Sequence, residues 1–239
     1  SLFLFPKDVA RPNKDETYIK NIFYGFRPSV IKANPLLYLT LVSFLAFAIA
    51  MQVFMPYFLI VIQKNLHFEG LDFTIIMGSV LLAACLFTVL IGLFMDKIGK
   101  NRILVPALGV TFVGMIGMFF AKEMAFIIPA GIVMMSGYMI STAVLGSKVR
   151  DYTPRNEVGL FQGIRMIFVV LIPMVTGPFI GEASYMFTAA EYINDYGQSV
   201  KLPNEYIYLA AAGVLLLAIA PVIILIIKDK KTRALANKK

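Results

Sequence analysis

The charged residues best placed to act together lie in one short segment, Gly92–Arg102, which reads GLFMDKIGKNR. Its charged members are Asp96, Lys97, Lys100 and Arg102, and its glycines are Gly92 and Gly99. The flanking runs, residues 73–95 and 103–121, carry no charge, and each approaches the roughly 20 apolar residues that cross a bilayer. We therefore expect a tight polar turn between two membrane helices. In this turn Gly99 supplies left-handed backbone, and Gly92 lets a neighbouring helix approach.

A second charged stretch, Lys148–Gly163, contains Asp151, Arg155 and Glu157 around the helix-breaking Pro154. Glu157 comes directly before the next apolar run, where a carboxylate stabilises a helix N-terminus. These residues form either a charge cluster between helices or a set of separately solvated loop charges. The residues alone leave both interpretations open.

Polar side chains inside the apolar runs are the main clue to a binding site. The cavity candidates are Gln52, Tyr57, Tyr138, Ser141 and Arg165. Gln52 lies deep in its run, where an amide must face a partner helix or a water-filled cavity, and Pro56 frees the carbonyl of the same residue. Arg165 lies seven residues into its run, about 10 Å from the end. It either extends to the membrane surface or contributes to gating or substrate contact.

Four glycines in the fifth apolar run have the spacing of a helix-packing face. They are Gly159, Gly163, Gly177 and Gly181. They form two GxxxG pairs that are 18 residues apart, which equals five helical turns. We therefore predict that all four share one face, against which another helix backbone packs closely.

The composition of the 239 residues belongs to a membrane protein: 59% are hydrophobic, 15% are charged, and the mean hydropathy is +0.79. Six charge-poor runs are long enough to span a bilayer. They are Leu36–Gln63, Phe73–Met95, Ile103–Ala121, Met124–Ser147, Val158–Gly181 and Tyr206–Ile227. The sequence shows no metal-ligand cluster, nucleophile motif or phosphate-binding loop, so we expect no cofactor, no metal and no enzymatic activity. The basic residues follow the loops and do not form a nucleic-acid patch.

The distribution of basic residues predicts the orientation, because lysine and arginine are retained on the cytoplasmic side. Nineteen fall on one side and three, Lys64, Lys122 and Lys201, on the other. We expect an integral protein of the plasma or inner membrane with both ends cytoplasmic. The expected units are the end of a preceding helix (1–5), a central cytoplasmic linker with an amphipathic helix (6–34), a six-helix half-bundle (35–228) and a basic cytoplasmic tail (229–239).

Written as G-x-x-x-D-[RK]-x-G-[RK]-x-[RK], residues 92–102 resemble the signature loop of the major facilitator superfamily of secondary transporters. The resemblance implies an all-α membrane fold in which six transmembrane helices form two inverted three-helix repeats, the C-terminal half of a twelve-helix bundle. It also implies that Asp151 closes a charge cluster with Lys100 or Arg102, and that substrate binds between this half and a missing N-terminal half.

By this resemblance we expect the chain to move a small organic solute by alternating access. The amides, hydroxyls and tyrosines in the apolar runs favour a sugar-like or otherwise neutral or amphipathic solute. Its expected partners are the N-terminal half, membrane lipid, the solute and a coupling ion for symport or antiport. Two other functions stay open: a six-helix protein that dimerises, and a membrane sensor or scaffold that transports nothing.

Overall fold

The computed structural model describes residues 24–154, 158–194 and 196–236. Arg155, the expected helix end at residues 1–5 and most of the expected linker helix lie outside these ranges. The long elements are α3 (Pro35–Phe54), α5 (Gly70–Ile98), α6 (Lys100–Phe120), α7 (Met124–Tyr152), α8 (Val158–Met166), α9 (Ile172–Tyr185) and α10 (Tyr206–Ala236). The short ones are α2 (Pro28–Ala33), α4 (Phe58–Ile60), β1 (Glu191–Ile193) and β2 (Ser199–Lys201).

Among the described residues, six helical spans are long and apolar enough to cross a membrane, as the sequence predicted. They are Pro35–Asn65, Gly70–Met95, Lys100–Phe120, Met124–Tyr152, Phe161–Tyr185 and Tyr206–Thr232. Helices suit this environment because each satisfies its own backbone hydrogen bonds without water. The protein is therefore an all-α integral membrane protein.

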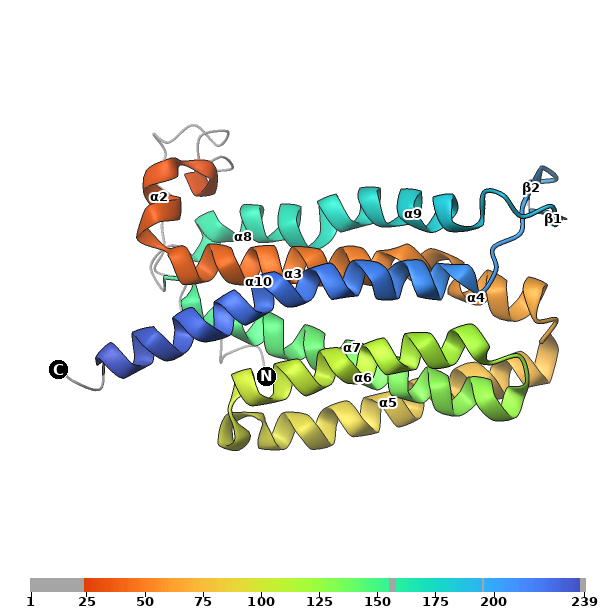
Figure 1. Cartoon of the computed structure of the whole chain (residues 1–239), viewed down its shortest axis with the longest axis horizontal. Coiled ribbons are helices and arrows are strands. Elements are labelled where there is room, and N and C mark those ends of the chain that lie inside the picture. The colour runs from red at the N-terminus through yellow and green to blue at the C-terminus, as the bar shows by residue number, and fades with distance from the viewer. Residues whose placement is uncertain (1–23, 155–157, 195, 237–239) are drawn as a thin grey trace, which may run out of the picture.

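The helices pack as two interlocked repeats, α3–α5–α6 and α7–α9–α10. The first helix of each repeat packs mainly on the later helices of the other: α3 on α9 and α10, and α7 on α5 and α6. Figure 1 shows the result, with α3, α9 and α10 lying together on one side and α5, α6 and α7 on the other. This exchange makes α3 and α7 equivalent members of the two inverted repeats.

Two spans contain irregular turns next to their prolines. The first span passes from α3 through a 3-10 turn (Met55–Tyr57) and α4 into a π turn (Val61–Asn65). In the fifth span, a π turn (Ile167–Leu171) separates α8 from α9 and lies just before Pro173. Proline removes a backbone donor and crowds the preceding turn, so the helix changes its winding there.

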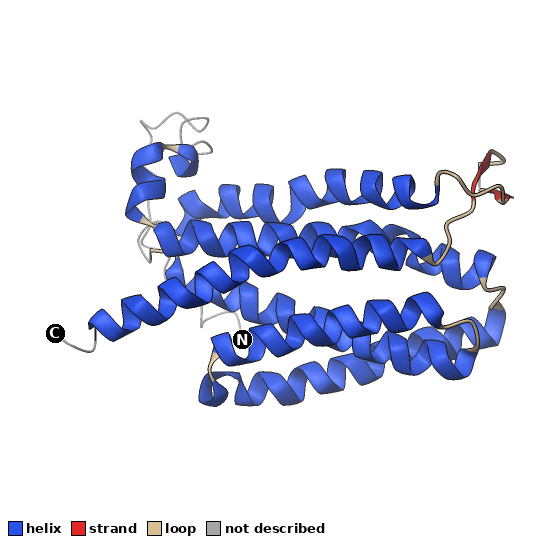
Figure 2. Ribbon diagram, in the orientation of Figure 1, coloured by secondary structure: helices blue, strands red, loops and turns tan. Residues whose placement is uncertain are grey.

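The two ends of the bundle differ. One end, here called the basic end, holds the α5–α6 junction, the C-terminal part of α7 and the C-terminal part of α10. The opposite end, here called the strand end, carries the antiparallel hairpin β1–β2 (Figure 2). In this hairpin Tyr192 lies opposite Val200. At the basic end α5 and α6 are separated by Gly99 alone, whose φ of 95° is in the region that favours glycine. The polar turn is therefore one residue long, and its charges lie in helix ends.

The described end of the expected linker packs against α8 at the basic end. A 3-10 turn (Tyr24–Phe26) precedes α2, and the Tyr38 hydroxyl on α3 donates a hydrogen bond to the Gly25 carbonyl. A Cβ at Gly25 would lie 3.1 Å from Ile164 Cδ1 on α8, so this turn fits closely over that helix.

Candidate transport cavity and charge clusters

A cavity of 350 Å³ opens beside the middle of α3 and α7 and is here called the central cavity. It is lined by Phe44, Phe47, Ala48, Met51, Gln52, Met55, Tyr138, Thr142 and Val169. None of these lining residues is charged, and three of them carry an amide or a hydroxyl. Such a lining can hold a solute by hydrogen bonds and apolar contact without a countercharge.

Gln52 and Tyr138 are the two predicted candidates that reach the central cavity. The Tyr138 ring stacks on Phe47 with 6.2 Å between centroids. Among the described residues, neither the Gln52 amide nor the Tyr138 hydroxyl has a hydrogen-bond partner within the chain. Both groups therefore remain available to a solute or to water.

Ser141 does not line the central cavity, although it was expected to. It is fully buried, and its hydroxyl has no partner among the described residues. Its neighbour Thr142 lines the cavity instead. Because successive residues on a helix point about 100° apart, a one-residue error in the predicted face is enough to explain the difference.

Tyr57 also lies away from the central cavity, at the strand end. Its hydroxyl donates to the Pro178 carbonyl at 3.0 Å, and its ring meets the edge of Tyr185. Tyr57 is the last residue of the 3-10 turn Met55–Tyr57, which follows the regular part of α3 that lines the central cavity. The structure therefore divides Gln52 and Tyr57 between two cavities.

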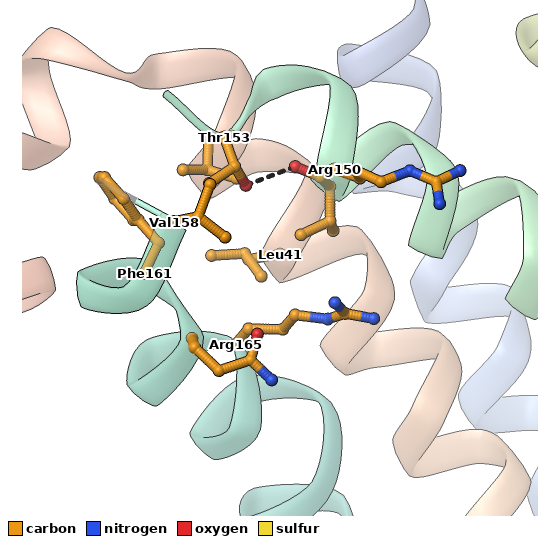
Figure 3. Close-up of a pocket in the computed structure, with 9 residues that line it drawn as sticks. Leu41, Arg150, Thr153, Val158, Phe161 and Arg165 are labelled. Atoms are coloured by element: carbon orange, nitrogen blue, oxygen red, sulfur yellow. Dashed lines mark hydrogen bonds between the residues drawn. The ribbon is translucent and has the colours of Figure 1, made fainter. Parts of the chain in front are cut away.

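Arg165 lines a third cavity, of 160 Å³, at the basic end. Figure 3 shows the Arg165 side chain extended beneath Leu41, while the Arg150 side chain points away from the cavity. The remaining walls are largely apolar and include Phe161 and Val158. Arg165 therefore lies near the end of the bundle and outside the central cavity.

The four predicted packing glycines do not share one environment. A Cβ at Gly177 would lie 2.4 Å from Gln52 Cβ, and one at Gly181 would lie 2.3 Å from the Val53 carbonyl oxygen, so α9 approaches α3 closely there. A Cβ at Gly159 would have no described atom within 4 Å. The π turn at Ile167–Leu171 lies between the two pairs, and one extra residue in a turn rotates the following helix face by about 100°. The prediction of a single face is therefore wrong for Gly159, and for Gly163 it stays a prediction.

The signature segment contributes an ion pair between α6 and α7 at the basic end. Lys100 Nζ lies 2.5 Å from Asp151 Oδ2, with the two side chains 17% and 42% exposed. Asp96 and Lys97 lie in the last turns of α5, and Arg102 is exposed at the start of α6. A Cβ at Gly92 would have no described atom within 4 Å, so none of the described helices approaches this glycine closely. The segment thus joins neighbouring helices through Lys100.

A second charge cluster, which the sequence did not reveal, is buried at the same end. Lys148 on α7 and Asp229 on α10 form an ion pair of 3.4 Å, and their side chains are only 1% and 2% exposed. Asn101 on α6 donates to the same Asp229 oxygen at 2.6 Å. Three helices therefore meet at one carboxylate, which the sequence had assigned to the cytoplasmic tail.

The spacing of residues contains the signal that could have identified this cluster. On α10, Leu215, Ala218, Val222 and Leu225 are buried, and Asp229 continues the same three- and four-residue spacing. A residue in that register faces the neighbouring helices whether it is apolar or charged. The charge of Asp229, considered alone, had suggested that the side chain is exposed to solvent.

The comparisons with known proteins agree with this architecture. Residues 4–239 match the family described as the Major Facilitator Superfamily. No curated protein and no solved structure matches the chain. The match covers almost the whole length, and the six spans packed as inverted repeats fit it, so the chain belongs to the Major Facilitator Superfamily of membrane transporters.

Proposed function

We propose that this bundle is the C-terminal half of a secondary transporter that carries a small neutral or amphipathic organic solute by alternating access. The observation that carries the proposal is the uncharged, partly polar central cavity between α3 and α7. These are the first helices of the two inverted repeats, and in such folds the solute binds near the midplane at the repeat interface. The partner is an N-terminal six-helix bundle that closes the open side of this cavity.

The lining of the central cavity favours a solute without net charge. A bare charge in a low-dielectric site needs a countercharge, and the described lining offers none. Gln52, Tyr138 and Thr142 can bond hydroxyl or amide groups, while Phe44 and Phe47 supply flat apolar surface. The volume of 350 Å³ lies at the lower end of the roughly 300–1,000 Å³ typical of small-molecule pockets.

The two charge clusters suit different parts of a transport cycle. Lys100–Asp151 is partly exposed, and such pairs contribute only about 0–1 kcal/mol, so this pair can break and reform as the inside opens and closes. Lys148–Asp229 is buried, and separating it would take a partner of opposite charge from each of two buried groups. The buried cluster therefore keeps α7 and α10 together while the exposed pair responds to movement.

The orientation of the bundle in the membrane is inferred from the distribution of lysine and arginine. Cytoplasmic loops retain lysine and arginine, so the basic end faces the cytoplasm and the strand end faces outward. We propose a plasma or inner membrane as its location. Since the described lining of the central cavity contains no carboxylate, a coupling ion for symport or antiport would bind to the partner half.

The test is solute uptake by cells that express the transporter, measured over a panel of neutral and amphipathic solutes. Gln52→Ala should raise KM about tenfold with normal surface expression, because a hydrogen-bond donor and acceptor in the cavity lining is lost. Gln63→Ala is the matched control, since Gln63 lies on the same span but outside the central cavity. An unchanged KM in Gln52→Ala would assign Gln52 to packing against α9 alone.

A further inference from the structure

The strand end contains a second polar cavity, of 410 Å³, apart from the central one. It is bounded by the 3-10 turn after α3, the C-terminal end of α9 and the hairpin β1–β2. Its lining residues are Tyr57, Ile60, Glu182, Tyr185, Tyr192, Asn194, Val200, Lys201 and Pro203. Three tyrosines and a carboxylate converge here, which the transport proposal does not require.

Two of the tyrosines are fixed in place by their surroundings. Tyr57 and Tyr185 meet edge to face with centroids 5.3 Å apart, and the Tyr57 hydroxyl is held by the Pro178 carbonyl at 3.0 Å. A Cβ at Gly181 would lie 2.7 Å from Tyr57 Cε2, so the ring fits directly over that glycine. An aromatic wall held this way loses little freedom when a ligand binds.

The third ring comes from the hairpin. Tyr192 on β1 lies opposite Val200 on β2, and both line the cavity, so the hairpin presents this face towards the α9 end. Aromatic rings attract cations over their faces, and several rings around one space form the cages that bind alkylated ammonium groups. The hairpin therefore adds a third aromatic ring to the cavity lined by Tyr57 and Tyr185.

The lining carries one carboxylate, Glu182, and one ammonium, Lys201. Lys201 is paired with Glu191 at 3.0 Å, and Glu191 also accepts a hydrogen bond from Ser199 at 2.6 Å. Glu182 is exposed on the cavity rim and forms no ion pair with any described residue. One carboxylate is thus left to attract a ligand of opposite charge.

We propose that this strand-end cavity binds a small organic cation, an amine or a quaternary ammonium group. Glu182 supplies the countercharge, and the tyrosine rings hold the alkyl groups around the positive nitrogen. The site is separate from the central cavity, which lacks a countercharge, and its occupancy does not depend on what the protein transports. With the basic end in the cytoplasm, the site opens on the outer surface.

Choline binding to the purified full chain in lipid nanodiscs, measured by calorimetry, tests the proposal. The neutral probe 3,3-dimethylbutan-1-ol has the same shape without the charge and should bind at least tenfold more weakly, because it gains neither the ion pair nor the cation–π contact. Glu182→Gln should weaken choline binding about fivefold. Glu123→Gln, a change of a strand-end carboxylate outside the cavity, should leave it unchanged.

The hairpin tyrosine separates ligand contact from packing. Tyr192→Leu should weaken choline binding about threefold, whereas Tyr192→Phe keeps the ring and should bind like the wild type. Equal binding of choline and its neutral isostere would overturn the proposal, and so would a Glu182→Gln protein of normal thermal stability with unchanged choline affinity. Absence of choline and tetramethylammonium binding to the wild type would do the same.

Discussion

The two ends of the bundle use charge in different ways. Between described residues, the ion pairs include Lys100–Asp151 and Lys148–Asp229 at the basic end and Lys64–Glu69 and Lys201–Glu191 at the strand end. Both basic-end pairs join different long helices, whereas the strand-end pairs of the described residues join positions close in sequence. At the strand end, helices approach through glycine and aromatic packing.

This difference teaches where ionic contacts can hold the arrangement of helices. A pair within one hairpin or one turn stabilises only that segment, while a pair between helices opposes their separation. Burial adds to the contrast, since Lys148–Asp229 is almost inaccessible to solvent and Lys64–Glu69 is 48% and 68% exposed. The effects of mutations at the two ends on stability and activity should therefore differ in size, and their order can be predicted.

The largest effect is expected at the buried pair. Lys148→Met leaves the buried Asp229 carboxylate without this cation, which should lower the free energy of unfolding by about 3 kcal/mol. Thermal unfolding of the purified protein measures it. The double variant Lys148→Met with Asp229→Leu should recover most of the loss, and Lys64→Met at the strand end should change little. A double variant as unstable as the single one would contradict the assigned pairing.

Close helix packing should give the next largest effect. Gly177→Ala puts a Cβ 2.4 Å from Gln52 Cβ, so overpacking should cost about 1–3 kcal/mol. Gly159→Ala is the matched control on the same span, because its Cβ meets no described atom within 4 Å and alanine favours the helix by up to about 1 kcal/mol. Thermal unfolding should move in opposite directions for the two variants. Equal shifts would mean that the π turn does not separate their environments.

The exposed pair should matter little for stability and more for turnover. Lys100→Ala should change the free energy of unfolding by less than about 1 kcal/mol. Its transport rate should nevertheless fall severalfold at unchanged KM, because the basic end closes less well. Asp96→Asn is expected to act the same way, with normal membrane insertion. Normal turnover in both variants would remove the signature segment from conformational control.

The smallest effect is expected in the hairpin. The Ser199 hydroxyl, followed by the Lys201 ammonium, lowers the pKa of Glu191 below its ordinary value by bonding to the carboxylate. A lowered folded pKa means that the stabilisation is present above the unfolded pKa of about 4.3 and is lost as pH falls through the folded value. A spin label at Tyr196→Cys in a Cys85→Ser background should become more mobile below about pH 4. With Glu191→Gln added, mobility should no longer depend on pH in that range.

The sequence predicted the helical spans well, because long apolar runs have few alternatives in a membrane. Helix ends were less predictable. α7 continues past Ser147 to Tyr152, and α10 continues past Ile227 to Ala236, because helices extend into the hydrated surface where charges are tolerated. Apolar runs mark the membrane core and not the helix itself.

The candidate site was harder to predict, for two physical reasons. The direction in which a side chain points can be predicted only where the helix is regular. The irregular turns at Met55–Tyr57 and Ile167–Leu171 change this direction for Tyr57 and for the glycines of the fifth span. The buried Asp229 was assigned to solvent on charge alone, although its register matched the buried stripe of α10. Gln52, in an unbroken part of α3, lies in the central cavity.

The most direct test of the transport proposal asks whether the central cavity opens to both sides of the membrane. Thr142 lines this cavity, so Thr142→Cys in a Cys85→Ser background places one thiol there. A membrane-impermeant maleimide is added to right-side-out or to inverted vesicles. Alternating access predicts labelling from both sides. Labelling from one side only, or from neither, would contradict it.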